Sequence, residues 1–225
     1  MRVFSNPDTV ARVEGLIFDL DGTLVDTAPG IERCLRQALI EVAPGVMPPV
    51  TADLIGPPVR DMVGCLMPEA DEAVLDAGVL AFRRCYDGDG WRDAVPYAGT
   101  SEMLVAMRSA GRRLFIVTNK PRVPTDRIME HLEWRDLFDG VICRNDTVPE
   151  FADKAAALAH LVMLESLDVT RMLFVGDTAD DAEAARTCGV RFAFAGYGYG
   201  AVATLPWATI DSPTALLTLL DRGKG

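Results

Sequence analysis

Five short apolar stretches run along the chain, and none of them alternates polar with apolar residues. They are GLIFDL (15–20), RLFIVT (113–118), GVICR (140–144), MLFVG (172–176) and RFAFA (191–195). Strands that are covered on both faces have this pattern, whereas a half-exposed strand alternates with a period of two. The pattern therefore predicts five buried parallel strands.

Helical periodicity fills the intervals between the later strands. Amphipathic patterns cover residues 123–132, 153–166 and 179–188, and a last one at 212–222 closes the chain. Regular alternation of strand and helix is typical of a doubly wound sheet with helices on both faces. We therefore expect an α/β fold with a Rossmann-like parallel sheet.

The interval between the first two strands is different, because it exceeds 90 residues. A strand–helix–strand crossover needs far fewer residues, so this interval predicts an insert. Helical patterns occur near 28–43, 51–66 and 70–86, without a convincing strand. An insert that follows the first strand lies above the carboxyl ends of the strands, where open α/β sheets bind ligands.

The expected organisation is thus a core of residues 1–27 and 96–225 with an all-helical domain at 28–95. The linkers near 24–28 and 94–99 would act as hinges, and the insert as a lid that excludes water when it closes.

Two aspartates follow the first strand. Residues i and i+2 of a strand point the same way, so Asp19 and Asp21 can face one crevice. One carboxylate could attack a substrate while the other handles protons, or both could hold a divalent cation. A solvated turn or a helix cap is the plainer alternative.

A second acidic site, GDTADD, follows the strand at 172–176. It supplies Asp177 at the strand end and Asp180 and Asp181 in the next helix. Several convergent carboxylates cannot all ionise without a counter-cation, and an all-oxygen ligand set suits Mg²⁺. For Asp180 and Asp181, capping of the helix N-terminus is the alternative.

Two further stretches carry polar groups that suit a phosphate. Thr118 and Asn119 end a strand and could bind phosphate oxygens or merely close a turn. Lys154 opens a helix, where a cation is unfavourable for the helix dipole. It is either an ordinary surface lysine or the cation that offsets the acidic crevice, with Lys120 as a competing candidate.

The amino-acid composition limits the classes of binding partner. The chain is 49% hydrophobic and 24% charged, with a formal net charge of −11. No basic cluster offsets this charge, which argues against nucleic acid or an anionic membrane as a partner. No signal core or long apolar run is present, so we expect a cytoplasmic protein.

The five cysteines are scattered and odd in number, which favours free thiols. They are Cys34, Cys65, Cys85, Cys143 and Cys188.

The chain contains the motif FDLDGTLVDT, followed in order by Thr118, Lys154 and the acidic site at Asp177. With these motifs, residues 14–27 and 96–222 resemble the haloacid dehalogenase-like hydrolase superfamily. The resemblance implies that Asp19 is a nucleophile that forms an aspartyl-phosphate and that Asp21 is the general acid/base. The insert is similar to the helical cap of this family.

The same resemblance implies the remaining roles. Thr118 becomes a phosphate ligand with Asn119 beside it, and Lys154 becomes the charge-balancing lysine. The Mg²⁺ ligands are Asp177, Asp19 and the backbone carbonyl of Asp21, with Asp181 as the last acid of the G-D-x-x-x-D pattern. Asp180 matches no motif position.

The implied function is a Mg²⁺-dependent phosphomonoesterase that acts on a small, phosphoglycolate-like metabolite, as a monomer or homodimer. The presence of Asp21 favours phosphate chemistry over cleavage of a carbon–halogen bond. Arg60, in the cap stretch LIGPPVRDMVG, is a candidate for binding a second anionic group of the substrate. A nucleotide monophosphatase, a pyrophosphatase, a sugar phosphomutase and a non-catalytic binding or regulatory protein remain as alternatives.

Overall fold

A six-stranded parallel sheet forms the centre of the molecule. The computed structural model describes residues 13–45, 48–51 and 54–221. The strand order is β5 (Gly140–Cys143), β4 (Arg113–Thr118), β1 (Gly15–Phe18), β6 (Met172–Gly176), β7 (Arg191–Ala195) and β8 (Ala208–Ile210). Every neighbouring pair in this sheet is parallel. The first strand of the chain therefore lies in the middle, with β4 and β6 on either side.

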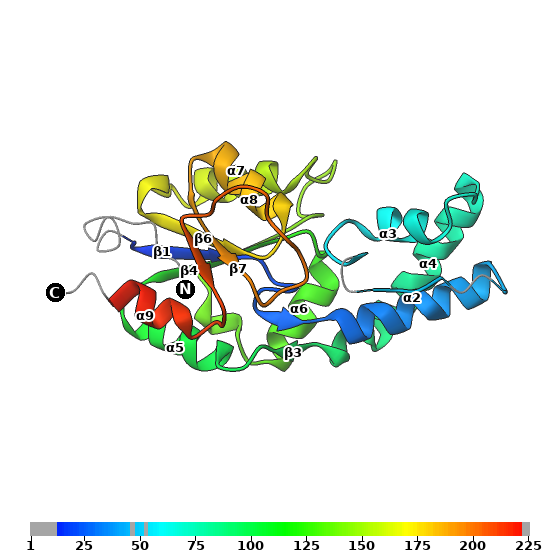
Figure 1. Cartoon of the computed structure of the whole chain (residues 1–225), viewed down its shortest axis with the longest axis horizontal. Coiled ribbons are helices and arrows are strands. Elements are labelled where there is room, and N and C mark those ends of the chain that lie inside the picture. Colours follow the sequence, from blue (N-terminus) through cyan, green and yellow to red (C-terminus); the bar gives the residue numbers. More distant parts are fainter. Residues whose placement is uncertain (1–12, 46–47, 52–53, 222–225) are drawn as a thin grey trace.

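Helices cover both faces of the sheet, as Figure 1 shows. One face packs on α5 (Thr100–Ser109), α6 (Arg122–His131) and α9 (Ala215–Asp221), and the other on α7 (Lys154–Leu164) and α8 (Ala179–Cys188). Successive β1 residues alternate between the two cores: Leu16 and Phe18 belong to the first, and Ile17 belongs to the second. All three side chains are fully buried. This explains why the strand contains no polar residue until it ends.

The predicted α/β sheet is confirmed, and its five predicted strands are all present. In and around this sheet, a strand and a helix go beyond the predicted set. Strand β8 has only three residues at the sheet edge, and α5 contributes Met103, Leu104 and Met107 to the core.

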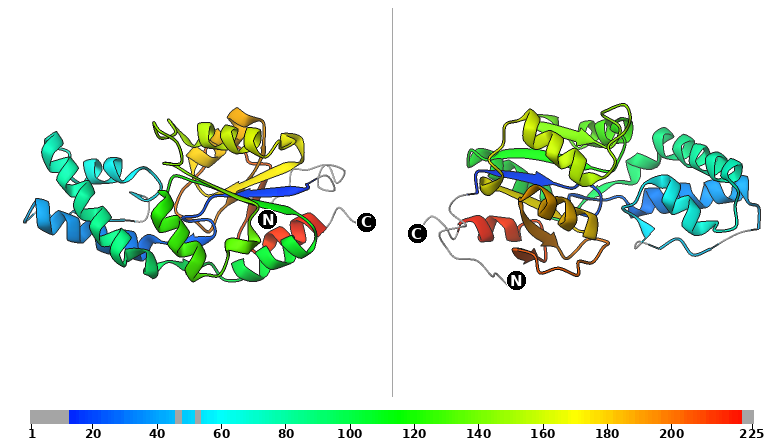
Figure 2. Two further views of the ribbon diagram at one scale, coloured as in Figure 1. Left: turned by 180° about the vertical axis from the view of Figure 1, so that it is seen from behind. Right: turned by 90° about the horizontal axis from the view of Figure 1, so that it is seen from above.

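The described part of the segment between Asp26 and Val95 contains three α-helices with a hydrophobic core of their own. They are α2 (Ala28–Val42), α3 (Val59–Leu66) and α4 (Glu72–Gly88), and their packed side chains include Leu35, Val63 and Phe82. The helix expected at 51–66 begins only at Val59, and residues 52–53 lie outside the described part of the chain. Figure 2 shows these helices at the far end of the molecule from α9. We call them the helical insert.

Two short strands join the insert to the sheet. Strand β2 (Val25–Asp26) pairs in antiparallel fashion with β3 (Val95–Pro96), so the chain enters and leaves the insert side by side. Both strands lie within the linkers that the sequence suggested as hinges. Among the described residues, no helix combines the length and the apolarity needed to cross a bilayer.

The expectation that all five cysteines are free thiols is wrong for two of them. Cys34 of α2 and Cys85 of α4 form a disulfide, with their Cα atoms 5.5 Å apart. The two helices pack against each other within the insert core, and this packing brings residues 51 positions apart into contact. Cys65, Cys143 and Cys188 are free.

We expect this disulfide to stabilise the insert. Replacing both cysteines, as Cys34→Ser with Cys85→Ser, should lower the free energy of unfolding of the insert by about 4 kcal/mol, because a loop of this length loses its cross-link in the unfolded chain. Urea unfolding of the oxidised protein and of this double variant measures the difference. Cys65→Ser, at an exposed free thiol, is the matched control. Equal stability of the wild type with and without dithiothreitol would contradict the expectation.

Candidate active site

The acidic groups lie at the carboxyl ends of β1 and β6, the central strands of the sheet. Asp19 continues the pairing of β1, since its backbone N–H donates to the Val175 carbonyl at 2.9 Å. Asp177 directly follows β6. Because β1 and β6 are parallel neighbours, their ends coincide, and both aspartates are buried at the same edge.

A tight turn after Asp21 lets the first motif, FDLDGTLVDT, approach the second acidic site, GDTADD. Gly22 has a φ of +80°, and a Cβ atom at this position would lie 2.3 Å from Asp177 Oδ2. Only glycine adopts this backbone conformation readily, and only glycine leaves room for the carboxylate. Thr23, in the same turn, donates its hydroxyl to Asp177 Oδ1 at 2.9 Å.

Asp181 lies in the first turn of α8 (Ala179–Cys188) and is also buried. Its Oδ2 accepts from the backbone N–H of Thr178 at 2.9 Å and from the Thr178 hydroxyl at 2.6 Å. The two residues form a capping box at the helix N-terminus. The capping role suggested for Asp181 is therefore real, and it leaves the second carboxylate oxygen free for another contact.

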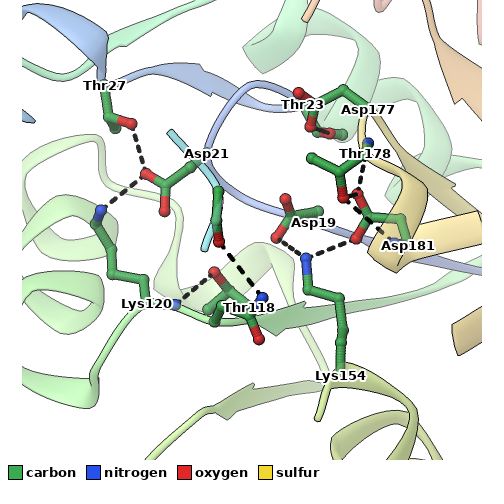
Figure 3. Close-up of polar contacts among 12 residues, drawn as sticks. Asp19, Asp21, Thr23, Thr27, Thr118, Lys120, Lys154, Asp177, Thr178 and Asp181 are labelled. Carbon is green, nitrogen blue, oxygen red and sulfur yellow. Dashed lines mark hydrogen bonds and ion pairs between the residues drawn. The ribbon is translucent and has the colours of Figure 1, made fainter. Parts of the chain in front are cut away.

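Lys154 supplies that contact. Its buried ammonium group lies 2.6 Å from Asp181 Oδ1 and 2.9 Å from Asp19 Oδ1, as Figure 3 shows. The ion pairs link the start of α7 with the end of β1 and the first turn of α8. Of the two readings of Lys154, surface residue or offsetting cation, the structure favours the second.

One positive charge does not balance the three buried carboxylates. Burial raises the pKa of Asp19 well above its ordinary value despite the ion pair with Lys154. Burial also raises the pKa of Asp177 to about 6, with the negative charge of Asp181 adding to the effect. The cluster therefore favours an additional cation.

The donor set suits a divalent metal ion. Asp19, Asp177 and Asp181 each offer one carboxylate oxygen, and these oxygens lie within 4.8 Å of one another. Asp19 Oδ1 contacts Lys154 as an ion pair but accepts no regular hydrogen bond. Hard oxygen ligands of this kind fit Mg²⁺. The Asp21 carboxylate is not part of this group, which leaves only its backbone carbonyl for the ligand role that the sequence suggested.

Asp21 lies apart from the metal candidates, in a second polar group. Its Oδ1 accepts from the Thr27 hydroxyl at 2.6 Å and lies 2.8 Å from the ammonium group of Lys120 (Figure 3). Lys120 in turn lies 4.7 Å from the ring centre of Tyr86, in α4 of the insert. Lys120 and Lys154 are thus not alternatives, since each pairs with a different aspartate of the first motif.

Thr118 and Asn119 lie at the end of β4, beside Lys120. The Thr118 hydroxyl is buried and accepts from the backbone N–H of Lys120 at 3.1 Å. The Asn119 side-chain amide donates to the carbonyl of Gly56, in the insert, at 3.5 Å. Core and insert therefore meet at this strand end.

Arg60 forms ion pairs away from the acidic groups. It lies in α3 and pairs with Glu72 and Asp76 of α4, so its guanidinium group contributes to contacts within the insert. The structure brings together Asp19, Asp21, Thr118, Asn119, Lys154, Asp177 and Asp181, and it does not bring Arg60 into contact with them.

Thr27 and Tyr199 are among the residues of the site that were not predicted. Thr27 belongs to the quoted motif FDLDGTLVDT, and a hydroxyl six residues after Asp21 could have suggested its role. Tyr199 donates its backbone N–H to Asp177 Oδ2 at 2.9 Å. The only signal for it in the sequence is the repeated glycine–tyrosine stretch GYGYG at 196–200.

The carboxyl edge of the parallel sheet thus combines buried acidic groups, two buried lysines and three carboxylates that could hold a metal ion. The family model for haloacid dehalogenase-like hydrolases matches residues 16–195. The chain belongs to this family.

Relatives and solved structures agree with this assignment. The chain is 32% identical over 193 residues to a phosphoglycolate phosphatase from Nitrosospira multiformis, covering 83% of this chain and 85% of the relative. It is 33% identical over 189 residues to the tyrosine-protein kinase PtkA of Mycobacterium tuberculosis, covering 82% of this chain but only 62% of PtkA. The haloacid dehalogenase-like protein SP0104 from Streptococcus pneumoniae has the same fold, with a TM-score of 0.80 at 24% identity over 92% of this chain and 98% of that chain.

The raised pKa of Asp177 predicts a pH dependence of stability in the metal-free protein. Asp177 ionises near pH 3.8 in the unfolded chain and near pH 6 in the folded one. The folded state therefore binds more protons in this window, and the contribution of Asp177 to the free energy of unfolding should fall by about 2 kcal/mol as the pH rises from 4 to 7.

Urea unfolding in EDTA at several pH values measures this slope. In Asp177→Asn the contribution of this carboxyl group is absent, so the decrease should be smaller by the same amount. The test compares how the free energy of unfolding changes with pH, and not its absolute value, because the substitution also alters the hydrogen bonds of Thr23 and Tyr199. Identical slopes for the two proteins would show that Asp177 ionises normally.

Proposed function

We propose that the chain is a Mg²⁺-dependent phosphomonoesterase that acts on a small phosphorylated metabolite of the phosphoglycolate type. The observation that carries this proposal is the separation of the two aspartates of the first motif. Asp19 lies with the metal-type carboxylates and Lys154, whereas Asp21 lies with Thr27 and Lys120. Two carboxyl groups in different environments can take different chemical roles.

Asp19 is the proposed nucleophile. A phosphate ester brings at least one negative charge toward an anionic carboxylate, so the approach requires compensating positive charge. Lys154, 2.9 Å from Asp19, supplies part of it. When bound by Asp19, Asp177 and Asp181, Mg²⁺ would supply the rest by offsetting the charge of the carboxylates and of the phosphate.

The proposed reaction has two steps, which are transfer of the phosphate to Asp19 and hydrolysis of the aspartyl-phosphate. An Asp19 oxygen attacks the phosphorus, the ester P–O bond breaks, and the leaving oxygen takes a proton from Asp21. Asp21 then takes a proton from a water molecule, whose oxygen attacks the phosphorus of the aspartyl-phosphate. Phosphate leaves, and the Asp19 carboxylate is regenerated. Proton transfer of this kind contributes about 10²- to 10⁴-fold to the rate.

Thr118 and Asn119 are the proposed ligands of the transferred phosphate, because a hydroxyl and an amide lie at the end of β4, next to Lys120. Arg60 is left out of this proposal, since it pairs with acidic residues of the insert. The contact of Asn119 with Gly56 supports a role for the insert in closing the site over a small substrate. We further propose that the protein works in the cytoplasm as a monomer or homodimer.

The substrate class can be tested with a panel of phosphorylated compounds in the presence of Mg²⁺, scored by kcat/KM from the release of free phosphate. The panel contains phosphoglycolate, sugar phosphates, nucleoside monophosphates, pyrophosphate and, because of the similarity to PtkA, phosphotyrosine. We expect the highest kcat/KM for a small phosphomonoester and no turnover in EDTA. Turnover that persists in EDTA, or none with the folded, Mg²⁺-loaded protein, would overturn the proposal.

Variants of the first motif should separate the two roles. Asp19→Asn should lower kcat by at least about a thousandfold, because the nucleophile is lost. Asp21→Asn should lower kcat by about 10²- to 10⁴-fold and should still allow phosphate transfer to Asp19 from a substrate with a good leaving group. Steady-state kinetics and mass spectrometry of the acid-quenched protein measure both effects.

Asp180→Asn is the matched control, because Asp180 is exposed and lies beside Asp181 at the start of the same helix. It should keep kcat within about twofold of the wild type. Full activity of Asp19→Asn would show that another group attacks the phosphorus.

A further inference from the structure

Tyr199 contacts two parts of the molecule that are far apart in the sequence. Its backbone N–H donates to Asp177 Oδ2 at the acidic cluster. Its hydroxyl group lies at the start of the helical insert, within hydrogen-bond distance of Asp26, Thr27 and Ala28. One residue of the segment after β7 therefore links the end of β6 to the hinge strand β2 and the start of α2.

The segment that carries Tyr199 is held tightly against the cluster. A Cβ atom at Gly198 would lie 2.3 Å from Asp177 Cβ and 2.4 Å from the carbonyl oxygen of Gly22. A Cβ atom at Gly200 would lie 2.5 Å from the carbonyl oxygen of Asp177. Side chains cannot occupy these positions, so the glycines on both sides of Tyr199 allow the close approach. The position of Tyr199 is thus fixed by the acidic cluster.

The hydroxyl group uses its full hydrogen-bonding capacity. It donates to Asp26 Oδ1 at 2.7 Å, and it accepts from the backbone N–H groups of Thr27 at 2.6 Å and Ala28 at 3.0 Å. A tyrosine hydroxyl has one proton to donate and can accept two hydrogen bonds. All three are made here, to three consecutive residues.

These contacts satisfy backbone N–H groups at the start of α2, and Asp26 Oδ1 also accepts from the Ala28 N–H at 3.1 Å. Thr27 is the N-cap residue of α2, but its side chain does not cap the helix. The Thr27 hydroxyl instead donates to Asp21 Oδ1 at 2.6 Å. A helix start needs acceptors for its free N–H groups, and Tyr199 provides one for Thr27 and Ala28. The backbone of Thr27 is thus held by Tyr199 while its side chain holds Asp21.

We propose that Tyr199 is a positioning residue that fixes the start of α2 relative to the acidic cluster, so that Thr27 holds Asp21 in place for proton transfer. This inference rests on the proposed function, since it assigns the proton transfer to Asp21. Tyr199 touches neither the substrate nor the proton in this scheme. It acts through Thr27, and it also ties the hinge of the insert to the metal-type carboxylate Asp177.

Tyr199→Phe tests the link, because it removes the hydroxyl while keeping the ring and the backbone N–H that contacts Asp177. We expect kcat to fall about tenfold, since a catalytic group that shifts by a fraction of an ångström loses activity of this order. KM and the Mg²⁺ concentration for half-maximal activity should change less than twofold. A general loss of structure would change all three quantities.

A double-mutant cycle identifies the route. Thr27→Val removes the hydroxyl that contacts Asp21 and should lower kcat by itself. If Tyr199 acts through Thr27, the double variant should have nearly the same kcat as Thr27→Val alone. Tyr197→Phe is the matched control, because the Tyr197 hydroxyl belongs to the same segment but donates to the Thr23 carbonyl at 2.8 Å. The fold-change in kcat that Tyr197→Phe causes should be the same in the wild type and in Thr27→Val, as expected for independent effects.

A measurement without turnover separates this inference from the proposed function. Amide hydrogen exchange of a peptide that covers residues 24–35 should show faster exchange in Tyr199→Phe than in the wild type and Tyr197→Phe, in the absence of substrate. Unchanged exchange there, or independent effects of Tyr199→Phe and Thr27→Val on kcat, would overturn the inference. A wild type that lacks phosphatase activity but shows the exchange difference would overturn only the catalytic part.

Discussion

The convergence of three buried carboxylates at one edge of the sheet is the constraint on which the rest of the site depends. Asp19, Asp177 and Asp181 have almost no exposure to water, and their mutual repulsion is costly in a medium of low dielectric constant. Lys154 neutralises only part of this charge. The surrounding groups therefore serve to hold the carboxylates in fixed positions, and the remaining imbalance favours a cation.

The supporting contacts show how the fold meets this constraint. Thr23 and Tyr199 donate to the two oxygens of Asp177, and Thr178 donates to Asp181. The donors come from the turn after β1, the segment after β7 and the start of α8, all of which emerge at the carboxyl edge of the sheet. A parallel sheet thus gathers residues from distant parts of the sequence at one site. Asp21 is kept separate by Lys120 and Thr27, and this separation gives the two aspartates of the first motif different surroundings.

Much of this arrangement could be predicted from the sequence. Buried parallel strands read as continuous apolar runs, and the polar residues that end such runs must share one edge of the sheet. This reasoning placed Asp19, Asp21, Thr118 and Asp177 correctly at the strand ends. Strand β8 has too few residues to produce a pattern. The buried residues of α5 do follow helical spacing, so this helix was detectable.

Other features depend on packing that no local pattern records. The disulfide between Cys34 and Cys85 follows from the way α2 lies against α4, and scattered cysteines carry no trace of it. Lys154 could equally have been a surface residue, because its partner Asp19 lies 135 positions earlier in the chain. Arg60 looked like a substrate ligand, yet two acidic residues of the neighbouring helix pair with it. The role of Tyr199 depends on a close approach between backbones that only the glycines around it reveal.

The pairing of β1 with β4 also has a consequence for how the chain folds. Gly15 pairs with Arg113, so this contact joins residues nearly 100 positions apart. Closing so long a loop is entropically costly and slows folding. The helical insert, however, has its own hydrophobic core and brings its two ends together at β2 and β3. If the insert folds first, it turns this long loop into a short one, and the central strands of the sheet can then find each other as near neighbours.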